Sequence, residues 1–167
     1  MSPATRPGLL LALLTLLLDQ LSKWWVLEVL DLPTRRSVEL LEAGPFALDF
    51  TMVWNRGVTF GLMSGDSAWN QWMLAGLAAI IAGVLLRWLW RAETIWVGLA
   101  LGMVVGGAIG NVIDRFRFGA VVDFVDASAW DWHWYVFNIA DAGIVVGVAI
   151  LVADALFRRQ GESRQSP

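Results

Sequence analysis

Residues 95–113 read IWVGLALGMVVGGAIGNVI and carry no charged side chain. The stretch is apolar and long enough to cross the hydrocarbon core of a bilayer, which needs roughly 17–25 helical residues. Glycine stands at every fourth position within it, at Gly98, Gly102, Gly106 and Gly110. A line of small residues at this spacing lets the backbone of a neighbouring helix approach closely. The stretch therefore predicts a transmembrane helix packed tightly in a small bundle.

Three further stretches are long and apolar enough to span a membrane, at about residues 9–30, 72–90 and 139–157. The first could instead be a secretory signal, but Asp19-Gln20-Leu21 lacks the small residues that a cleavage site needs. We therefore expect four transmembrane helices. Paired glycines predict close packing in two of them: Gly76 and Gly83 in the second helix, Gly143 and Gly147 in the fourth.

The composition supports an integral membrane protein. Of the 167 residues, 57% are apolar and 16% are charged. Soluble domains have about 45–50% apolar and about 25% charged residues. Because the chain has no Cys, a disulfide framework, a thiol nucleophile and a zinc–thiolate site are excluded. Its one histidine, His133, excludes a multi-histidine metal site. A net charge of −3 argues against nucleic acid as a partner. We expect one membrane domain over 1–167, without metal or organic cofactor.

Arginines next to the predicted helix ends indicate the orientation of the chain. Short basic segments favour the cytoplasmic side, and here they include Arg6 and the turn Arg91–Glu93. Both termini are therefore expected in the cytoplasm, with about residues 31–71 and 114–138 outside. The same cytoplasmic group of arginines comprises Arg6, Arg87, Arg91, Arg158, Arg159 and Arg164.

The first outer segment alternates between apolar and polar residues. The alternation runs through residues 36–41 and 46–54, with the turn residues Glu42-Ala43-Gly44-Pro45 between them. Period-two alternation around such a turn is typical of a β-hairpin. We expect a small antiparallel sheet on the outer membrane face.

Several polar residues lie where burial makes them costly, which marks them as candidates for a site. Asp19 and Lys23 are four residues apart and share a helix face, so they can neutralise each other. Asn111, Asp114 and Arg115 share a face where the third helix ends, and are expected to hold the outer helix ends together.

Two further carboxylates return to the same membrane face. Asp123 stands between Val121-Val122 and Phe124-Val125, and Asp141 stands at the outer start of the fourth helix. Asn138 and Asp141 also have the spacing of a helix capping pair, which would give Asp141 a purely structural role.

Two carboxylates at one poorly hydrated place share a proton, and such a pair can activate water for attack on an amide. An aspartic mechanism is therefore the simplest hydrolytic chemistry for this chain. From chemistry alone, Asp114 or Asp126 could take the place of Asp123. A Ser22–Lys23 pair is a poor alternative, because adjacent helical residues point to different faces.

Five strings together resemble the lipoprotein signal peptidases, or type II signal peptidases, of bacteria. They are LDQLSK at 18–23, WNRGVTFG at 54–61, GGAIGNVIDR at 106–115, VVDF at 121–124 and FNIAD at 137–141. The strings occur in order, with matching spacing, over nearly the whole chain. Arg56 and Thr59 stand where threonine and alanine are usual in this family. Ala142 stands directly after Asp141, where the family often has serine.

The resemblance implies an aspartic endopeptidase of the bacterial inner membrane. It implies removal of signal peptides from diacylglyceryl-modified prolipoproteins by cutting just before the lipidated cysteine, at a site near the outer face. The family fold implies an all-α membrane protein with four transmembrane helices, an outer β-cradle at about residues 36–60, and a short outer helix that covers the site. Membrane lipid is an implied partner, and the chain is expected to act as a monomer.

By resemblance, Asp123 and Asp141 are the catalytic pair. The positions implied to bind substrate or support the site are Asp19, Lys23, Asn55, Gly57, Asn111, Asp114, Arg115, Asn138 and Ala140.

A small ion- or proton-coupled transporter subunit is the alternative interpretation, because intramembrane Asp and Lys also mark ion pathways. A transporter favours an internal repeat and polar groups near mid-membrane in several helices. Here the carboxylates gather at one face, which is typical of an interfacial site.

Overall fold

The computed structural model describes residues 2–57, 68–130 and 132–163, without the side chains of 68–70 and 158–163. Its elements in chain order are α1 (Thr5–Trp24), the π-helical turn η1 (Trp25–Val29), α2 (Leu32–Arg35), β1 (Ser37–Ala43), β2 (Phe46–Asn55), α3 (Ala68–Leu89), α4 (Ile95–Phe118), β3 (Val121–Ala129), β4 (Trp132–His133) and α5 (Ile139–Ser163).

Within the described residues, four helices are long and apolar enough to cross a membrane, as the sequence predicts. The segments are Thr5–Val29, Gln71–Leu89, Ile95–Phe118 and Ile139–Phe157. The predicted end of the third helix at residue 113 is wrong, because α4 continues to Phe118, where Gly119, with a φ of 67°, caps it. Asp114 and Arg115 therefore lie within the last turns of α4.

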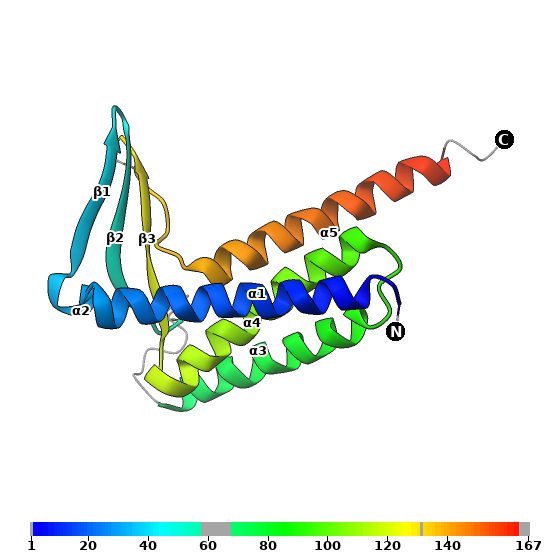
Figure 1. Ribbon diagram of the computed structural model, residues 1–167, viewed down its shortest axis with the longest axis horizontal. Helices are drawn as coiled ribbons and strands as arrows, with labels where there is room; N and C mark the ends of the chain where they lie inside the picture. Colours follow the sequence, from blue (N-terminus) through cyan, green and yellow to red (C-terminus); the bar gives the residue numbers. More distant parts are fainter. Residues whose placement is uncertain (1, 58–67, 131, 164–167) are drawn as a thin grey trace.

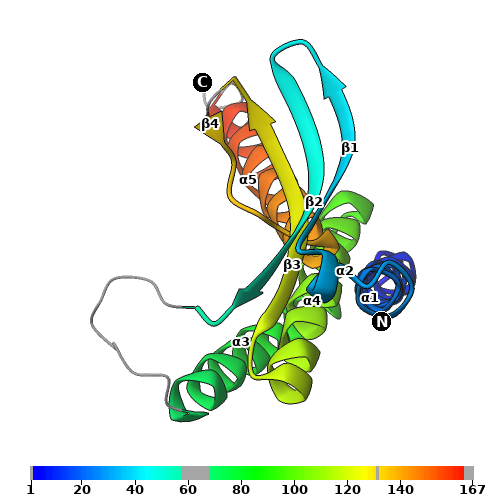
Figure 2. The ribbon, with the colours of Figure 1, turned by 90° about the vertical axis from the view of Figure 1, so that its left-hand side faces the viewer.

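The sheet stands at one end of the helical bundle, and both chain ends lie toward the other (Figure 1). Its strand order is β1-β2-β3-β4, and the neighbouring strands that pair are antiparallel. The predicted hairpin corresponds to β1 and β2, whereas residues 58–60 of the predicted β-cradle lie outside the described residues. Figure 2 shows the sheet from its own end of the molecule, with the helices behind it.

Strand β3 is absent from the sequence prediction. Its first four residues, Val121, Val122, Asp123 and Phe124, are all buried. Because both faces of this half-strand are covered, the apolar residues show no alternation, and a period-two pattern cannot reveal it. The sheet is therefore larger than the predicted hairpin, and it carries Asp123.

Apolar packing fixes the sheet to the end of α1. Val26, Leu32, Val122 and Phe124 form a buried cluster between η1, α2 and β3. Phe50 of β2 packs edge-on against Phe124, with 5.6 Å between the ring centroids. The four-residue helix α2 takes part in this cluster. Whether a short outer helix covers the site stays a prediction.

Glycines of α4 bring the helix backbones together as predicted. A Cβ on Gly98 would lie 2.6 Å from the carbonyl oxygen of Ala4, and one on Gly102 would meet the carbonyl oxygen of Gly8. By contrast, a Cβ on Gly76 or Gly83 would have no neighbour within 4 Å. The predicted close packing at these two glycines of α3 is wrong, because no described neighbouring helix comes within 4 Å of the added Cβ at either position.

This contrast gives a matched test. We expect Gly102→Ala to lower the free energy of unfolding by about 1–3 kcal/mol, because the added methyl must push α1 away from α4. Gly83→Ala should leave stability unchanged or raise it by up to about 1 kcal/mol, because alanine favours the helix and meets nothing. Unfolding of both variants in one detergent checks the prediction, and an equal loss in both would contradict it.

Candidate active site

Asp123 and Asp141 are joined by a network of asparagine amides. Asp123, on β3, is fully buried and accepts hydrogen bonds from Asn55 Nδ2 at 2.9 Å and Asn138 Nδ2 at 2.6 Å. Asp141, in the first turn of α5, accepts a hydrogen bond from Asn111 Nδ2 at 2.8 Å. Asn138 Nδ2 also lies 3.2 Å from Asn111 Oδ1, which closes the network.

The register of the sheet explains how Asn55 reaches Asp123. Asn55 is opposite Val121 and Val53 is opposite Asp123, so Asn55 and Asp123 point to the same face of the sheet. The amide of Asn55 is held in turn by Gly57, whose N–H donates to Asn55 Oδ1 at 2.9 Å. Gly57 has a φ of 69°, a backbone conformation that favours glycine.

The predicted capping pair at the start of α5 is confirmed. The Asp141 N–H donates to Asn138 Oδ1 at 2.9 Å, and the Asn138 N–H donates to Asp141 Oδ2 at 3.4 Å. The helix dipole also favours a negative charge at this place. Asn138 and Asp141 therefore belong both to the helix cap and to the amide network. Asn138 can do so because its side-chain oxygen faces the helix while its nitrogen faces Asp123.

The surroundings of Asp123 favour its protonated form. Burial, together with the negative charge of Asp141, raises the pKa of Asp123 to about 6, although the hydrogen bonds from Asn55 and Asn138 act to lower this pKa. A raised pKa on one of two interacting carboxylates is typical of a pair that shares a proton.

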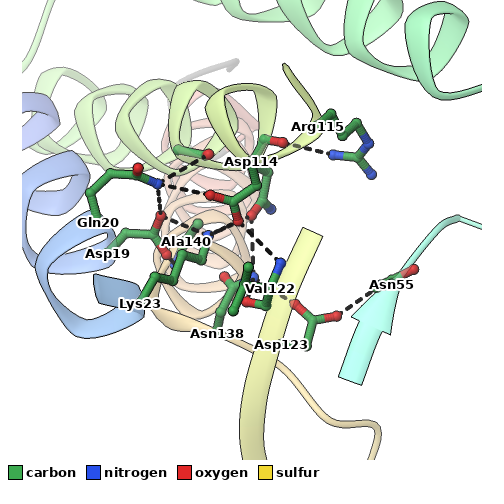
Figure 3. Close-up of polar contacts among 12 residues, drawn as sticks. Asp19, Gln20, Lys23, Asn55, Asp114, Arg115, Val122, Asp123, Asn138 and Ala140 are labelled. Atoms are coloured by element: carbon green, nitrogen blue, oxygen red, sulfur yellow. Dashed lines mark hydrogen bonds and ion pairs between the residues drawn. The ribbon is translucent and has the colours of Figure 1, made fainter. Parts of the chain in front are cut away.

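A buried ion cluster lies beside the amide network (Figure 3). Lys23 Nζ is 2.8 Å from Asp19 Oδ2 and 2.7 Å from Asp114 Oδ2, and it donates to Asn111 Oδ1 at 3.2 Å. At most 2% of any of these three charged residues is exposed. Gln20 Nε2 lies within hydrogen-bond distance of both carboxylates. The predicted Asp19–Lys23 pair is confirmed, and Asp114 joins it from α4.

The ion cluster holds the two segments that carry Asp123 and Asp141. Asp19 Oδ1 accepts from the backbone N–H of Ala140, at 2.9 Å, in the first turn of α5. Asp114 Oδ2 accepts from the backbone N–H of Val122, at 3.2 Å, one residue before Asp123. Through these two bonds, the ion cluster fixes the backbone beside each carboxylate.

Arg115 takes no part in the ion cluster. It points away from Asp114 (Figure 3), and its Nη1 donates to the Asn111 carbonyl oxygen at 3.2 Å. Its Nε is buried without a hydrogen-bond partner among the described residues. Of the predicted grouping of Asn111, Asp114 and Arg115, Asn111 and Asp114 both contact Lys23, whereas Arg115 lies outside the ion cluster.

The alternatives that the sequence leaves open for Asp123 have other partners. Asp114 is neutralised by Lys23, and Asp126 lies 3.3 Å from the exposed ring of His133. Ser22 donates its hydroxyl to the Asp19 carbonyl oxygen at 2.8 Å. In contrast to Asp114, Asp126 and Ser22, Asp123 contacts both Asn55 and Asn138. Within the described ranges, no three His, Asp or Glu side chains are grouped so as to hold a metal ion.

Two residues of the site escape the sequence analysis. Gln20 bridges Asp19 and Asp114, and the Tyr135 hydroxyl accepts from Asn55 Nδ2 at 2.6 Å. Gln20 stands beside Asp19 in a polar interruption of an apolar helix, which is a signal for a buried role. Tyr135 is the one tyrosine of the chain, but nothing in the sequence places it beside Asn55. Of the three residues that depart from the family strings, Thr59 lies outside the described residues.

Comparisons with known proteins agree with this architecture. Two solved structures described as bacterial membrane enzymes resemble the chain. One has a TM-score of 0.74 at 24% identity and covers 96% of this chain and 93% of that one. The other has a TM-score of 0.71 at 25% identity and covers 89% and 92%.

Sequence relatives are closer. The lipoprotein signal peptidase of Methylobacterium sp. (strain 4-46) is 45% identical over 161 residues, which are 96% of this chain and 95% of the relative. The lipoprotein signal peptidase of Methylorubrum extorquens (strain PA1) is 48% identical over 155 residues, which are 92% of this chain and 87% of the relative. These relatives are peptidases, so the transporter interpretation has no support from them. A family model described as "Signal peptidase (SPase) II" matches residues 11–157, a range that contains both carboxylates and the ion cluster. On these matches, the chain belongs to the signal peptidase II family.

Proposed function

We propose that the protein removes signal peptides from diacylglyceryl-modified prolipoproteins, cutting before the lipidated cysteine, with Asp123 and Asp141 as the catalytic pair. The observation that carries this proposal is the amide network that joins a buried Asp123 to Asp141. Membership of the signal peptidase II family supplies the substrate class.

The two carboxylates take different roles in the proposed reaction. Asp123, whose pKa is raised to about 6, holds the shared proton and gives it to the scissile carbonyl oxygen. Asp141, which accepts from Asn111 and lies in the first turn of α5, takes a proton from the attacking water. The water oxygen bonds to the carbonyl carbon. As the C–N bond breaks, the proton on Asp141 passes to the leaving nitrogen and the carbonyl oxygen returns its proton to Asp123.

The position of the site supports cleavage at a membrane surface. The sheet that carries Asp123 stands at one end of the four apolar helices, opposite the chain ends (Figure 1). We assign this end to the outer face of the cytoplasmic membrane and both termini to the cytoplasm, on the distribution of arginines. The signal helix and acyl chains of the substrate then stay in lipid, while its scissile bond reaches the sheet.

The remaining residues have supporting roles in this proposal. Asn55, Gly57, Asn111 and Asn138 orient the two carboxylates, and Arg115 lies where it can meet the substrate backbone or lipid headgroup. Asp19, Lys23, Asp114 and Ala140 hold the segments that carry the pair. The chain acts as a monomer with one domain over 1–167, and its partners are the prolipoprotein and membrane lipid.

Cleavage by the purified protein in detergent tests this function. We expect a diacylglyceryl-modified prolipoprotein to be cut immediately before the modified cysteine, with both fragments identified by mass. The same precursor without the diacylglyceryl group should remain intact, because its cysteine cannot be held at the lipid boundary. Absence of cleavage of the modified precursor by folded protein would overturn the proposal.

A further inference from the structure

The geometry points to Tyr135 as a positioning residue that acts through Asn55 on Asp123. This inference rests on the proposed function, because it assigns Asp123 to the catalytic pair. Tyr135 belongs to none of the five strings that carry the family resemblance.

The side-chain amide of Asn55 has a partner for each of its groups. Its oxygen accepts from the Gly57 N–H at 2.9 Å. Its nitrogen carries two N–H bonds, which serve Asp123 Oδ2 at 2.9 Å and the Tyr135 hydroxyl at 2.6 Å. Gly57 thus holds the oxygen of the Asn55 amide and Tyr135 holds its second N–H, while the first N–H bonds to Asp123.

Holding the amide matters because an asparagine side chain can turn over. If the Asn55 amide turned, its oxygen would face the carboxylate of Asp123, and two acceptors would oppose each other. Gly57 fixes the oxygen and Tyr135 fixes the second N–H, so the remaining N–H is aimed at Asp123. Without the Tyr135 hydroxyl, the Asn55 amide keeps the hydrogen bond from Gly57 but loses the one to Tyr135, so it rotates more freely.

The backbone holds Tyr135 in place although its ring is 65% exposed. Trp134 N–H donates to the Ala127 carbonyl oxygen at 2.8 Å, and Phe137 N–H donates to that of Val125 at 3.0 Å. Tyr135 lies between these two attachments to β3. The hydroxyl is thereby presented to Asn55 by a fixed loop and not by burial of the ring.

The exposed ring of Tyr135 could also serve as an anchor at the membrane surface. The two roles can be told apart because only the positioning of Asn55 needs the hydroxyl. Trp132 and Trp134 nearby are also exposed, and aromatic rings of this kind sit at membrane–water interfaces. An interfacial role depends on the ring and survives in phenylalanine, whereas positioning of Asn55 depends on the oxygen. Partial loss of solvent and the charges of Asp123 and Asp141 also raise the pKa of Tyr135, so its hydroxyl stays neutral.

Tyr135→Phe is therefore the informative change. We expect kcat to fall about 5- to 20-fold with KM within about twofold, because the bond serves the geometry of the pair more than binding. Trp134→Phe is the matched control, since it alters the neighbouring ring and leaves the Asn55 contact in place. Adding Tyr135→Phe to Asn55→Ala should cost nothing more, because Tyr135 acts through Asn55.

The pH dependence gives a readout that a merely structural role would not move. The pair needs its shared proton, so kcat/KM falls as the pH rises through the pKa of Asp123. The Asn55 hydrogen bond lowers that pKa, so weakening the bond raises the pKa and moves the alkaline limb to higher pH. The shift should appear in Tyr135→Phe, be larger in Asn55→Ala, and be absent from Trp134→Phe.

An infrared titration separates this inference from the proposed function. The carboxyl band of Asp123, assigned by its loss in Asp123→Asn, should titrate near pH 6 in wild type and at higher pH in Tyr135→Phe. A shift of this band without any cleavage by wild type would overturn the proposed function and leave the contact standing. Normal cleavage with an unshifted band, or equal effects of Tyr135→Phe and Trp134→Phe, would overturn the role of Tyr135.

Discussion

Asp123→Asn and Asp141→Asn are each expected to reduce cleavage at least about a thousandfold, because residues that act as one catalytic unit lose nearly all activity singly. An amide at position 123 cannot hold the shared proton, and an amide at position 141 cannot take a proton from water. The measurement is kcat on the diacylglyceryl-modified precursor.

The matched control for this prediction is Asp126→Asn. Asp126 lies on the same strand as Asp123, but its contact is with the exposed ring of His133. It should retain near-normal kcat. Asp123→Asn places an NH₂ group opposite the donors Asn55 and Asn138, so its folding must be checked by thermal unfolding. Asp141→Asn offers an independent variant. Substantial activity in either folded variant would contradict the aspartic assignment.

Lys23→Met should have the largest effect on stability, a loss of about 3–5 kcal/mol. Lys23 is the cation between Asp19 and Asp114, and its removal leaves two buried carboxylates without their countercharge. Methionine fills the space of the lysine stem, so the loss comes from charge and not from a cavity. Unfolding in detergent by heat or denaturant measures the effect.

Two further variants make this prediction specific. Glu28→Gln removes a charge from the exposed surface of the same helical segment and should change stability by less than about 0.5 kcal/mol. Adding Asp114→Asn to Lys23→Met should recover part of the loss. The remaining carboxylate, Asp19, still accepts from Gln20 and from the Ala140 N–H. A double variant no more stable than Lys23→Met would show that the charge imbalance is not the cause.

The membrane helices follow from the sequence because hydropathy and length decide them locally. The end of α4 does not, because Asp114 and Arg115 have the charges that usually end a span. Asp114 is tolerated inside the helix because Lys23 of α1 neutralises it. That contact joins residues far apart in the chain, and no spacing rule predicts it.

The site divides in the same way. The pairs Asn138–Asp141 and Asp19–Lys23 lie within one helical turn, so their spacing predicts the contacts that the structure has. The contact of Asn55 with Asp123 depends on the register of β2 and β3. The first half of β3, which carries Asp123, shows no alternation because both its faces are buried. Tyr135 reaches Asn55 through a loop fixed on that same strand, so its role depends on a strand the sequence does not reveal.

The hydrogen bond from the Ala140 N–H to Asp19 links α1 with α5, which is synthesised more than a hundred residues later. A nascent chain has α1, with Asp19 and Lys23 already able to neutralise each other, long before α5 leaves the ribosome. Asp141 enters the membrane only with α5, and its backbone is held only after Ala140 has met Asp19. A partly made chain that stops before α5 therefore contains Asp123 without Asp141, and so lacks one of the two carboxylates of the proposed pair. The proposed site is assembled only once α1 and α5 are both present and have met.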